Sequence, residues 1–321
     1  MDAEYVRGKD EMRITAAAAI SPGEVRQLAD GRAAVYTASV GAASGDLVKE
    51  NTTGQYTMTK TASVVLLDGQ RAYWDHSANS VTFRTVNDRD FYLGRIVGDA
   101  ASADTTCVVN INVDPAYDID VKTCPFLSVP TGTQAVGAFG FPRRLGGANS
   151  IELTATNEAQ CIDLLSVDRV AVGANPIVEA EIRIPANGST SAVDFNIGLA
   201  NGTSTTDADA ITESVFFHID GGALDIFAES DDGTTEVAAT DTTVNATEGS
   251  AVANRLHLMI DARDPASVKL YIDGVRVLSA TTFVLTAATG PLGLLVHLEK
   301  TSSTATGRVV IDRLTLRTAE Q

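Results

Sequence analysis

Four histidines and two clusters of carboxylates are the side chains with which this sequence could do chemistry. His76, His218, His257 and His297 stand alone, none within four residues of another. His218 in "FFHID" and His257 in "RLHLMID" lie within strand-like patterns, where a hydrogen-bonded or surface imidazole is commoner than a metal ligand. We therefore predict no metal site at the histidines.

The carboxylate clusters are "TTDADAIT" and "ESDDGTTE", with Asp207 and Asp209 in the first and Glu229, Asp231, Asp232 and Glu236 in the second. Calcium prefers loop carboxylates at such spacings, but neither stretch fits the twelve-residue EF-hand loop. Solvated turns are also rich in Asp and Gly. We interpret both clusters as turns and assign no metal, with calcium as the alternative.

A third carboxylate pair, Glu179 and Glu181, falls on one face of the strand pattern "VEAEIRI". Two carboxylates across a cleft are the machinery of glycosidases. Aromatic residues make up only 6% of the chain, and none gathers near this pair to form a sugar platform. A solvated strand face is the favoured interpretation. Phosphate-loop, zinc-helix and nucleophile-elbow motifs are also missing, so we predict no enzyme and no cofactor.

The chain's one tryptophan stands in "GQRAYWDHSANSVTF", directly before Asp75 and His76. An Asp-His pair beside a lone Trp could mark an active site or a turn. Tyr73 and Trp74 end a strand-like run, "DHSAN" is rich in turn formers, and "SVTF" resumes the strand pattern. We predict a hairpin in which Trp74 is a packing anchor.

Composition narrows the classes of partner. The chain has 321 residues, 24 basic and 41 acidic, with a net charge of −17. Without a basic patch, binding to nucleic acid by phosphate neutralisation is not expected. No apolar run approaches the ~20 residues that span a bilayer, so no membrane association is expected, nor is a Sec-type leader. Cys107, Cys124 and Cys161 form no CxxC pair and are predicted to be free thiols in a protein made in the cytoplasm.

Strand-like runs dominate the whole chain and predict an all-β protein. Residues 1–12 are charged and aperiodic, and we interpret them as an N-terminal arm. Short runs from 13 to 126 predict a small β-barrel or β-tulip-like domain, with one short helix over "SPGEVRQLAD" at 21–30. Prolines and glycines at 127–148 predict a linker. Cleaner alternation over 149–321 predicts an antiparallel β-sandwich of jelly-roll type, with a tight hairpin turn at Asp273-Gly274.

The N-terminal half resembles the capsid cement or decoration proteins of tailed bacteriophages over about 100 residues. The resemblance is carried by four segments in order: "LADGRAAVYTAS", "SGDLVKENTTGQYTMTKTAS", "LLDGQRAYWDHSANSVTF" and "FYLGRIVGDAASADTTCVVNINV". It implies a structural protein of the virion that binds the outer surface of the assembled capsid and stabilises it. It also implies the major capsid protein as partner and a homotrimer at three-fold positions of the shell.

The C-terminal half resembles concanavalin A-like lectin and glucanase domains and laminin-G jelly rolls. "VEAEIRI", "RLHLMIDARDPASVKLYIDGVRV" and "GRVVIDRLTLRT" carry this resemblance. The E-x-D-x-x-E signature of the glucanases is missing, so the resemblance implies a fold rather than an activity. The resemblance also implies an outward lectin-like domain with glycans as candidate ligands.

These patterns favour a head decoration protein. The alternative is a carbohydrate-binding adhesin of a tail or fibre, and a glycoside-active enzyme is the least favoured class. The capsid contact is expected in the arm, which could add an edge strand to a capsid loop. The candidate contact residues are Tyr5, Arg7, Met12 and Ile14.

Overall fold

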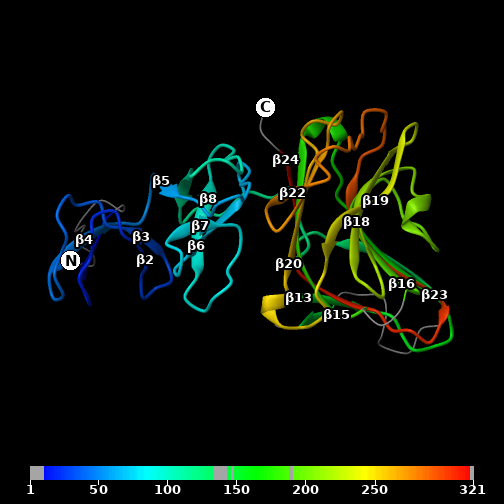
Figure 1. Ribbon diagram of the computed structural model, residues 1–321, viewed down its shortest axis with the longest axis horizontal. Coiled ribbons are helices and arrows are strands. Elements are labelled where there is room, and N and C mark those ends of the chain that lie inside the picture. The colour runs from blue at the N-terminus through cyan, green and yellow to red at the C-terminus, as the bar shows by residue number, and fades with distance from the viewer. Residues whose placement is uncertain (1–10, 133–142, 146–147, 188–190, 319–321) are drawn as a thin grey trace, which may run out of the picture. The chain divides into compact units, whose positions relative to one another are not determined.

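The computed structural model describes residues 11–132, 143–145, 148–187 and 191–318. The chain divides into two compact units, Met1–Ala116 and Tyr117–Gln321 (Figure 1). Antiparallel strands build both units, and the helical segments described are three short 3-10 turns, η1 (Val172–Ala174), η2 (Ala208–Ala210) and η3 (Val252–Asn254). The predicted all-β class is confirmed. No described helix is long and apolar enough to cross a bilayer.

Two sheets make up the N-terminal unit. The order of the first is β1 (Glu11–Thr15), β4 (Leu47–Asn51), β3 (Ala33–Val35) and β2 (Val25–Gln27). The order of the second is β5 (Gln55–Thr59), β9 (Thr106–Ile111), β8 (Phe91–Ile96), β6 (Arg71–Asp75) and β7 (Ser80–Thr82).

The second sheet curls, but among the described residues it does not close into the predicted barrel. One isolated bridge, between Lys60 and Val81, joins its two edges where a barrel would need a ladder. Strand β3 contributes Ala33 and Val35 to the same apolar core as Trp74 and Val81. The unit is therefore held together by a core shared between two sheets.

The helix predicted over 21–30 is wrong. The capping interaction does form, since the backbone N–H of Ser21 donates to the Glu24 carboxylate at 2.9 Å. Gly23 then takes a φ of +80°, which ends any helical turn. The chain continues as β2, which pairs with β3 through Val25 and Val35. Sheet pairing outweighs the local helix signal here.

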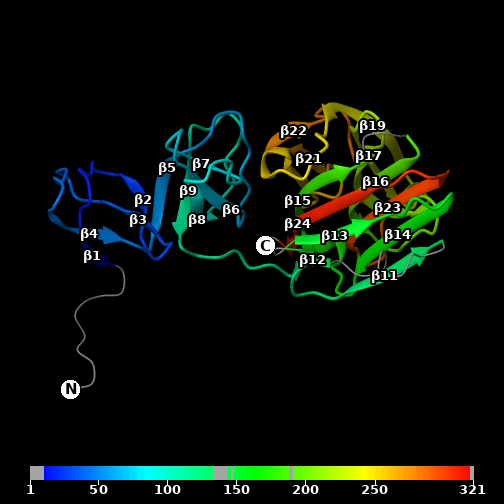
Figure 2. The same cartoon turned by 90° about the horizontal axis from the view of Figure 1, so that it is seen from below.

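The C-terminal unit is a sandwich of two antiparallel sheets (Figure 2). The eight-stranded sheet runs β12 (Arg143–Leu145), β13 (Ala148–Glu152), β24 (Arg308–Thr318), β15 (Pro176–Ala186), β20 (Leu256–Asp261), β21 (Lys269–Ile272) and β22 (Val275–Val277), and β10 (Ile119–Asp120) also pairs with β24. The seven-stranded sheet runs β11 (Phe126–Thr131), β14 (Glu158–Ser166), β23 (Gly293–Ser303), β16 (Val193–Ala200), β17 (Glu213–Asp220), β18 (Asp225–Asp232) and β19 (Glu236–Asn245).

The inner faces of these two sheets bury one large apolar core. Ile182 and Leu258 from the eight-stranded sheet and Phe195 and Phe217 from the seven-stranded sheet belong to it and are at most 1% exposed. Stretches of these strands alternate apolar and polar residues, so the same pattern that fills this core sends many polar side chains to the outer faces. The predicted sandwich is confirmed.

The second unit begins earlier than the sequence pattern indicated. Ile119 and Asp120 already pair with β24, and residues 126–131 form β11 against β14, although 127–148 was expected to be a linker. Pro130 is tolerated because β11 is an edge strand, where a missing N–H breaks no central ladder. Residues 133–142 and 146–147 of that segment lie outside the described residues.

Candidate functional site

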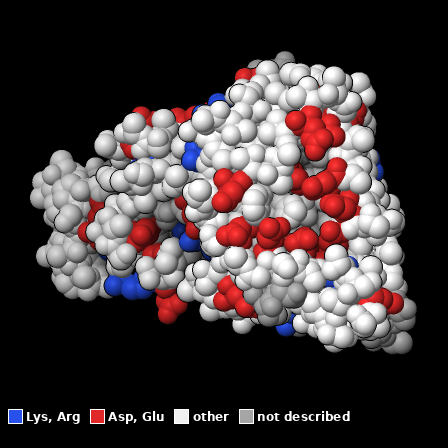
Figure 3. Space-filling model, turned by 45° about the vertical axis from the view of Figure 1, so that its right-hand side comes forward, with Lys and Arg blue, Asp and Glu red and all other residues white. Residues whose placement is uncertain are grey.

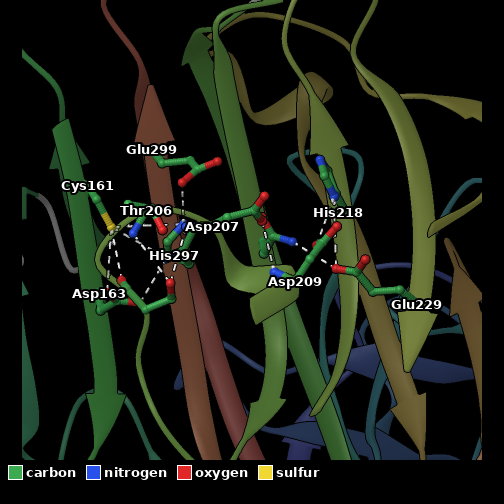
Figure 4. Close-up of polar contacts among 11 residues, drawn as sticks. Cys161, Asp163, Thr206, Asp207, Asp209, His218, Glu229, His297 and Glu299 are labelled. Carbon is green, nitrogen blue, oxygen red and sulfur yellow. Dashed lines mark hydrogen bonds and ion pairs between the residues drawn. The ribbon is translucent and has the colours of Figure 1, made fainter. Parts of the chain in front are cut away.

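A row of polar side chains crosses the outer face of the seven-stranded sheet. It comes from alternate positions of five neighbouring strands, whose other positions fill the core. Figure 3 shows a face of the protein on which carboxylates gather with few cations among them, and Figure 4 shows the two ends of the row, with Cys161, Asp163, His297 and Glu299 at one end and His218 and Glu229 at the other. From β14 to β18 its members are Cys161, Asp163, His297, Glu299, Asp194, Asn196, His218, Asp220 and Glu229.

The loop of residues 201–212 covers part of this face. Ala208 and Ile211 of the loop pack with Leu165, Phe216 and Leu295 of the sheet in a small second core. This packing holds the polar loop residues Ser204–Asp209 against the row. The row is therefore partly buried between a sheet and a loop.

One end of the row brings Asp209, His218 and Glu229 together. Nδ1 of His218 lies 3.9 Å from a carboxylate oxygen of each acid, and its Nε2 lies 3.0 Å from Oδ1 of Asp220. Glu229 is 6% exposed, and its Oε1 accepts a hydrogen bond from the amide of Asn196 at 3.0 Å. Burial, and then the nearby Asp209 carboxylate, raise the pKa of Glu229 to about 9. Both effects favour the protonated form of Glu229.

This protonation predicts a pH-dependent effect for Glu229→Gln. An acid with a raised folded-state pKa stabilises the fold fully below its ordinary pKa of 4.5 and loses that contribution as pH rises toward 9. Gln keeps the acceptor for Asn196 and cannot ionise. We expect the free energy of unfolding of the variant to gain on that of the wild type by up to about 1.4 kcal/mol per pH unit through this window.

Urea unfolding of both proteins between pH 5 and 9 measures this difference. Glu236→Gln, an exposed change on the neighbouring β19, is the matched control and should track the wild type. If the free energies of unfolding of Glu229→Gln and the wild type change with pH in parallel, Glu229 is ionised in the folded protein over this pH range.

The other end of the row holds Cys161, Asp163, His297 and Glu299. Nδ1 of His297 lies 2.9 Å from Oδ1 of Asp163, and Nε2 lies 3.2 Å from Oε2 of Glu299. Burial lowers the pKa of His297, but hydrogen bonds with Asp163, Cys161 and Glu299 outweigh it and raise the pKa well above 6.5. Burial raises the pKa of the Cys161 thiol.

Metal ions need several donors within reach of one point, and the described residues contain three groups whose donor atoms lie within 4.8 Å of one another. The groups are Cys161, Asp163 and His297; Asp194, His218 and Asp220; and Asp209, His218 and Glu229. Each group joins strands or loops that are distant in the chain, so the spacing of residues in the sequence does not reveal a full set of donors. The usable signals are pairs of donors two residues apart: Cys161 with Asp163, His218 with Asp220, and His297 with Glu299.

Glu179 and Glu181 are not on the solvated strand face that the sequence suggested. They are 0% and 6% exposed on β15. Arg317 and Arg313 pair with Glu179, and Arg313 lies 3.1 Å from Glu181. Burial opposes ionisation of Glu179, but Arg317, His257 and Arg313 outweigh it and hold its pKa well below the usual range. A carboxylate neutralised in this way is a poor general acid or base.

Of the residues singled out in the N-terminal unit, the described ones lie in its two sheets, with Met12 and Ile14 in the first and Trp74 in the second. Tyr5 and Arg7 lie outside the described residues. Met12 and Ile14 lie in strand β1, so the expected arm of 1–12 ends in a sheet. Both are half-buried, Ile14 packs on a small core, and the Met12 sulfur accepts a hydrogen bond from Arg32. These contacts direct the side chains of Met12 and Ile14 into their own unit.

The "YWDHSANSVTF" segment is the hairpin of β6 and β7. Trp74 is 6% exposed in the apolar core and stands opposite Val81. The Asp75 carboxylate accepts hydrogen bonds from the backbone N–H groups of Ser77 and Ala78, which closes the turn. His76 lines two surface hollows of about 410 and 530 Å³.

In the C-terminal unit, Asp273 and Gly274 join β21 to β22. Their φ angles are +48° and +75°. Two successive positive φ values belong to the tight turn that follows the strand twist.

Comparison with known proteins finds a family model that matches the first of the two units. Residues 6–111 match the family model of phage cement protein. The cement-protein match covers about a third of the chain and falls within the N-terminal unit. No curated protein matches the chain.

Solved structures similar to this chain include carbohydrate recognition domains, a GH16 protein and alginate lyases. The Emp47p carbohydrate recognition domain is 11% identical, with a TM-score of 0.41 over 61% of this chain and 95% of that one. A Bacteroides ovatus GH16 protein in complex with a G4G4G3G product is 9% identical, with a TM-score of 0.41 over 60% and 94%. Alginate lyase AlgAT5, from polysaccharide lyase family 7, is 15% identical, with a TM-score of 0.38 over 55% and 80%. Likenesses this weak carry no inference about what the C-terminal unit binds.

Proposed function

We propose that this protein decorates the head of a tailed bacteriophage, binding the outer surface of the assembled capsid through its N-terminal unit. The match of residues 6–111 to the phage cement protein family carries this proposal. The major capsid protein is the partner, and the protein is made in the host cytoplasm before it joins the virion.

Cementing needs no reaction, because a ligand that binds the assembled shell and not its free subunits stabilises the shell by linkage. At a concentration a hundredfold above Kd, each bound site contributes about 2.7 kcal/mol. A homotrimer on a three-fold position would multiply weak contacts through effective concentration. Many modest contacts over a lattice suffice for this role.

The open edge of β1 supports a contact by strand addition. β1 ends the order β1-β4-β3-β2, so among the described residues only β4 pairs with it. An unpaired edge is a template for another strand. Residues 1–10, with Tyr5 and Arg7, precede this edge directly. Met12 and Ile14 would take part through their backbone, since their side chains face their own unit.

Deleting residues 1–10 is expected to weaken binding to expanded empty shells at least tenfold, because a segment next to the docking edge is lost. Co-sedimentation with shells that lack the protein measures the affinity, and light scattering tests the trimer. The matched control is full-length Asp220→Asn, an exposed-face change in the other unit. Unchanged affinity after the deletion would reject the arm contact, whereas no binding by the full chain would reject the proposed function.

A second candidate function, glycan binding by an outward C-terminal unit, is favoured by the mixed row of amide, imidazole and carboxylate groups. Such groups hydrogen-bond sugar hydroxyls. A glycan array probed with the full chain and with Asn196→Ala tests it. Binding of the wild type to no glycan would exclude this candidate and the adhesin alternative together.

A further inference from the structure

Two strands of the seven-stranded sheet place four different donor side chains at the corners of a square. Cys161 and Asp163 are two residues apart on β14, and His297 and Glu299 are two apart on β23. In the antiparallel register Cys161 stands opposite Glu299, and Asp163 opposite His297. Residues two apart share a sheet face, so all four side chains project to the outer face together (Figure 4).

The distances among three of these donors match a tetrahedral metal site. Sγ of Cys161 lies 3.6 Å from Nδ1 of His297 and 3.6 Å from Oδ2 of Asp163. Zinc bonds of about 2.3 Å to sulfur and 2.0–2.2 Å to nitrogen and oxygen set tetrahedral edges of about 3.5 Å from the sulfur. Nδ1 of His297 lies 2.9 Å from the other oxygen of Asp163, Oδ1. If Oδ1 is the ligand, this contact needs to open by about 0.5 Å to fit a zinc tetrahedron.

The fourth side chain is placed as the supporting group of such a site. Glu299 Oε2 lies 3.2 Å from Nε2 of His297. In protein metal sites the ring nitrogen that does not bind the metal commonly donates its N–H to a carboxylate, which fixes the tautomer. With Nε2–H held by Glu299, the lone pair of Nδ1 points to the side where Cys161 and Asp163 lie.

The thiol and the Asp163 carboxylate both lie near Nδ1 of His297. Sγ is 3.6 Å from Nδ1, and Oδ1 of Asp163 is 2.9 Å from it. Donors gathered at one ring nitrogen suit coordination of a shared metal ion.

The three proposed ligands are buried, and a cavity gives access to them. Cys161, Asp163 and His297 are at most 2% exposed. Cys161 and Glu299 line a cavity of about 260 Å³ together with Thr205 and Thr206 of the covering loop. The cavity provides an entry path and room for a water molecule as a fourth ligand.

We propose that Cys161, Asp163 and His297 bind one zinc ion, with Glu299 positioning His297. The donor set selects the metal, because a thiolate with an imidazole suits zinc and a hard cation such as calcium takes oxygen ligands. The zinc would tie β14 and β23 together beneath the loop of residues 201–212.

The test uses the full-length protein loaded with Co²⁺ or Zn²⁺ and dialysed. We expect one zinc per chain by mass spectrometry of the metal, and a thiolate-to-cobalt charge-transfer band in the near ultraviolet. Cys161→Ser should lose that band. Cys124→Ser, at the partly buried free thiol, should keep it. Asp209→Asn, in the neighbouring donor group, should also keep it.

Glu299→Gln keeps all three ligands and should bind zinc with an affinity 10- to 100-fold lower. It therefore tests the positioning role even if Cys161→Ser fails to fold. The proposal is overturned if the wild-type protein gives no thiolate–cobalt band, or if Cys161→Ser binds as the wild type does. Either result would leave the four side chains as a hydrogen-bonded cluster only.

Discussion

Glu179→Gln is expected to destabilise the C-terminal unit by about 3–5 kcal/mol, the usual cost of removing one partner from a buried ion pair. Glu179 is fully buried, and Arg317 and Arg313 are 5% and 8% exposed. Both guanidinium groups pair with its carboxylate. Glutamine preserves the shape but leaves the buried Arg317 facing a neutral amide, while Arg313 keeps its ion pair with Glu181. Urea unfolding at pH 7 measures the loss.

The sign of the pH dependence gives a second check. Burial raises the pKa of Glu179, but Arg317, His257 and Arg313 outweigh it, so the folded-state pKa lies below the ordinary 4.5. Its stabilisation is therefore present above pH 4.5 and is lost as pH falls toward the folded-state value. The difference in free energy of unfolding between the wild type and Glu179→Gln should therefore become smaller below pH 4.5.

Glu152→Gln is the matched control for this change. Glu152 lies 4.0 Å from Arg308 in the same sheet, but its side chain is 56% exposed. Exposed pairs of this kind contribute at most about 1 kcal/mol. Equal stability of Glu179→Gln and the wild type would mean that the buried ion pairs give no net stabilisation.

Glu179 also shows where prediction from sequence ended. The alternation in "VEAEIRI" correctly indicates a strand with one polar face. It does not indicate whether that face is wet, because its partners Arg313 and Arg317 stand more than 130 residues away on β24. Local pattern sets the strand, and long-range pairing sets the environment of its side chains.

The grouping of side chains in the polar row also depends on long-range strand pairing. Hairpin turns such as Asp273-Gly274 depend on adjacent residues and are readable from the sequence. His297 and Cys161 meet only because β23 pairs with β14 in one register. A shift of this register by one residue would place the two side chains on opposite faces of the sheet. Their proximity could not be derived without knowing the order of strands in the sheet.

Trp74→Ala is expected to destabilise the N-terminal unit by about 3–5 kcal/mol, because it empties the place of a large side chain in a small core. Trp74 packs there with Val35, Phe91 and Ile111, and Val81 lies opposite on β7. The core joins both sheets of the unit, so a void at this position weakens the contact between them. Calorimetry of the full chain should show a lower transition for this unit.

Wild-type fluorescence identifies which transition belongs to the N-terminal unit, because Trp74 is the chain's one tryptophan and is buried. Trp74→Phe is the matched variant. The indole Nε1 has no hydrogen-bond partner among the described residues, so phenylalanine removes an unsatisfied donor while it keeps most of the apolar volume. We expect its cost to stay below about 1.5 kcal/mol.

Shell binding should follow the stability of this unit under the proposed function. Trp74→Ala should release from shells at a lower temperature than Trp74→Phe, while the transition of the C-terminal unit stays unchanged. Because a cement protein binds as a folded unit, loss of its core is loss of its contact surface. Trp74→Ala could instead keep full shell binding above the melting temperature of its N-terminal unit. In that case the folded core around the β6–β7 hairpin would be dispensable for the contact with the shell.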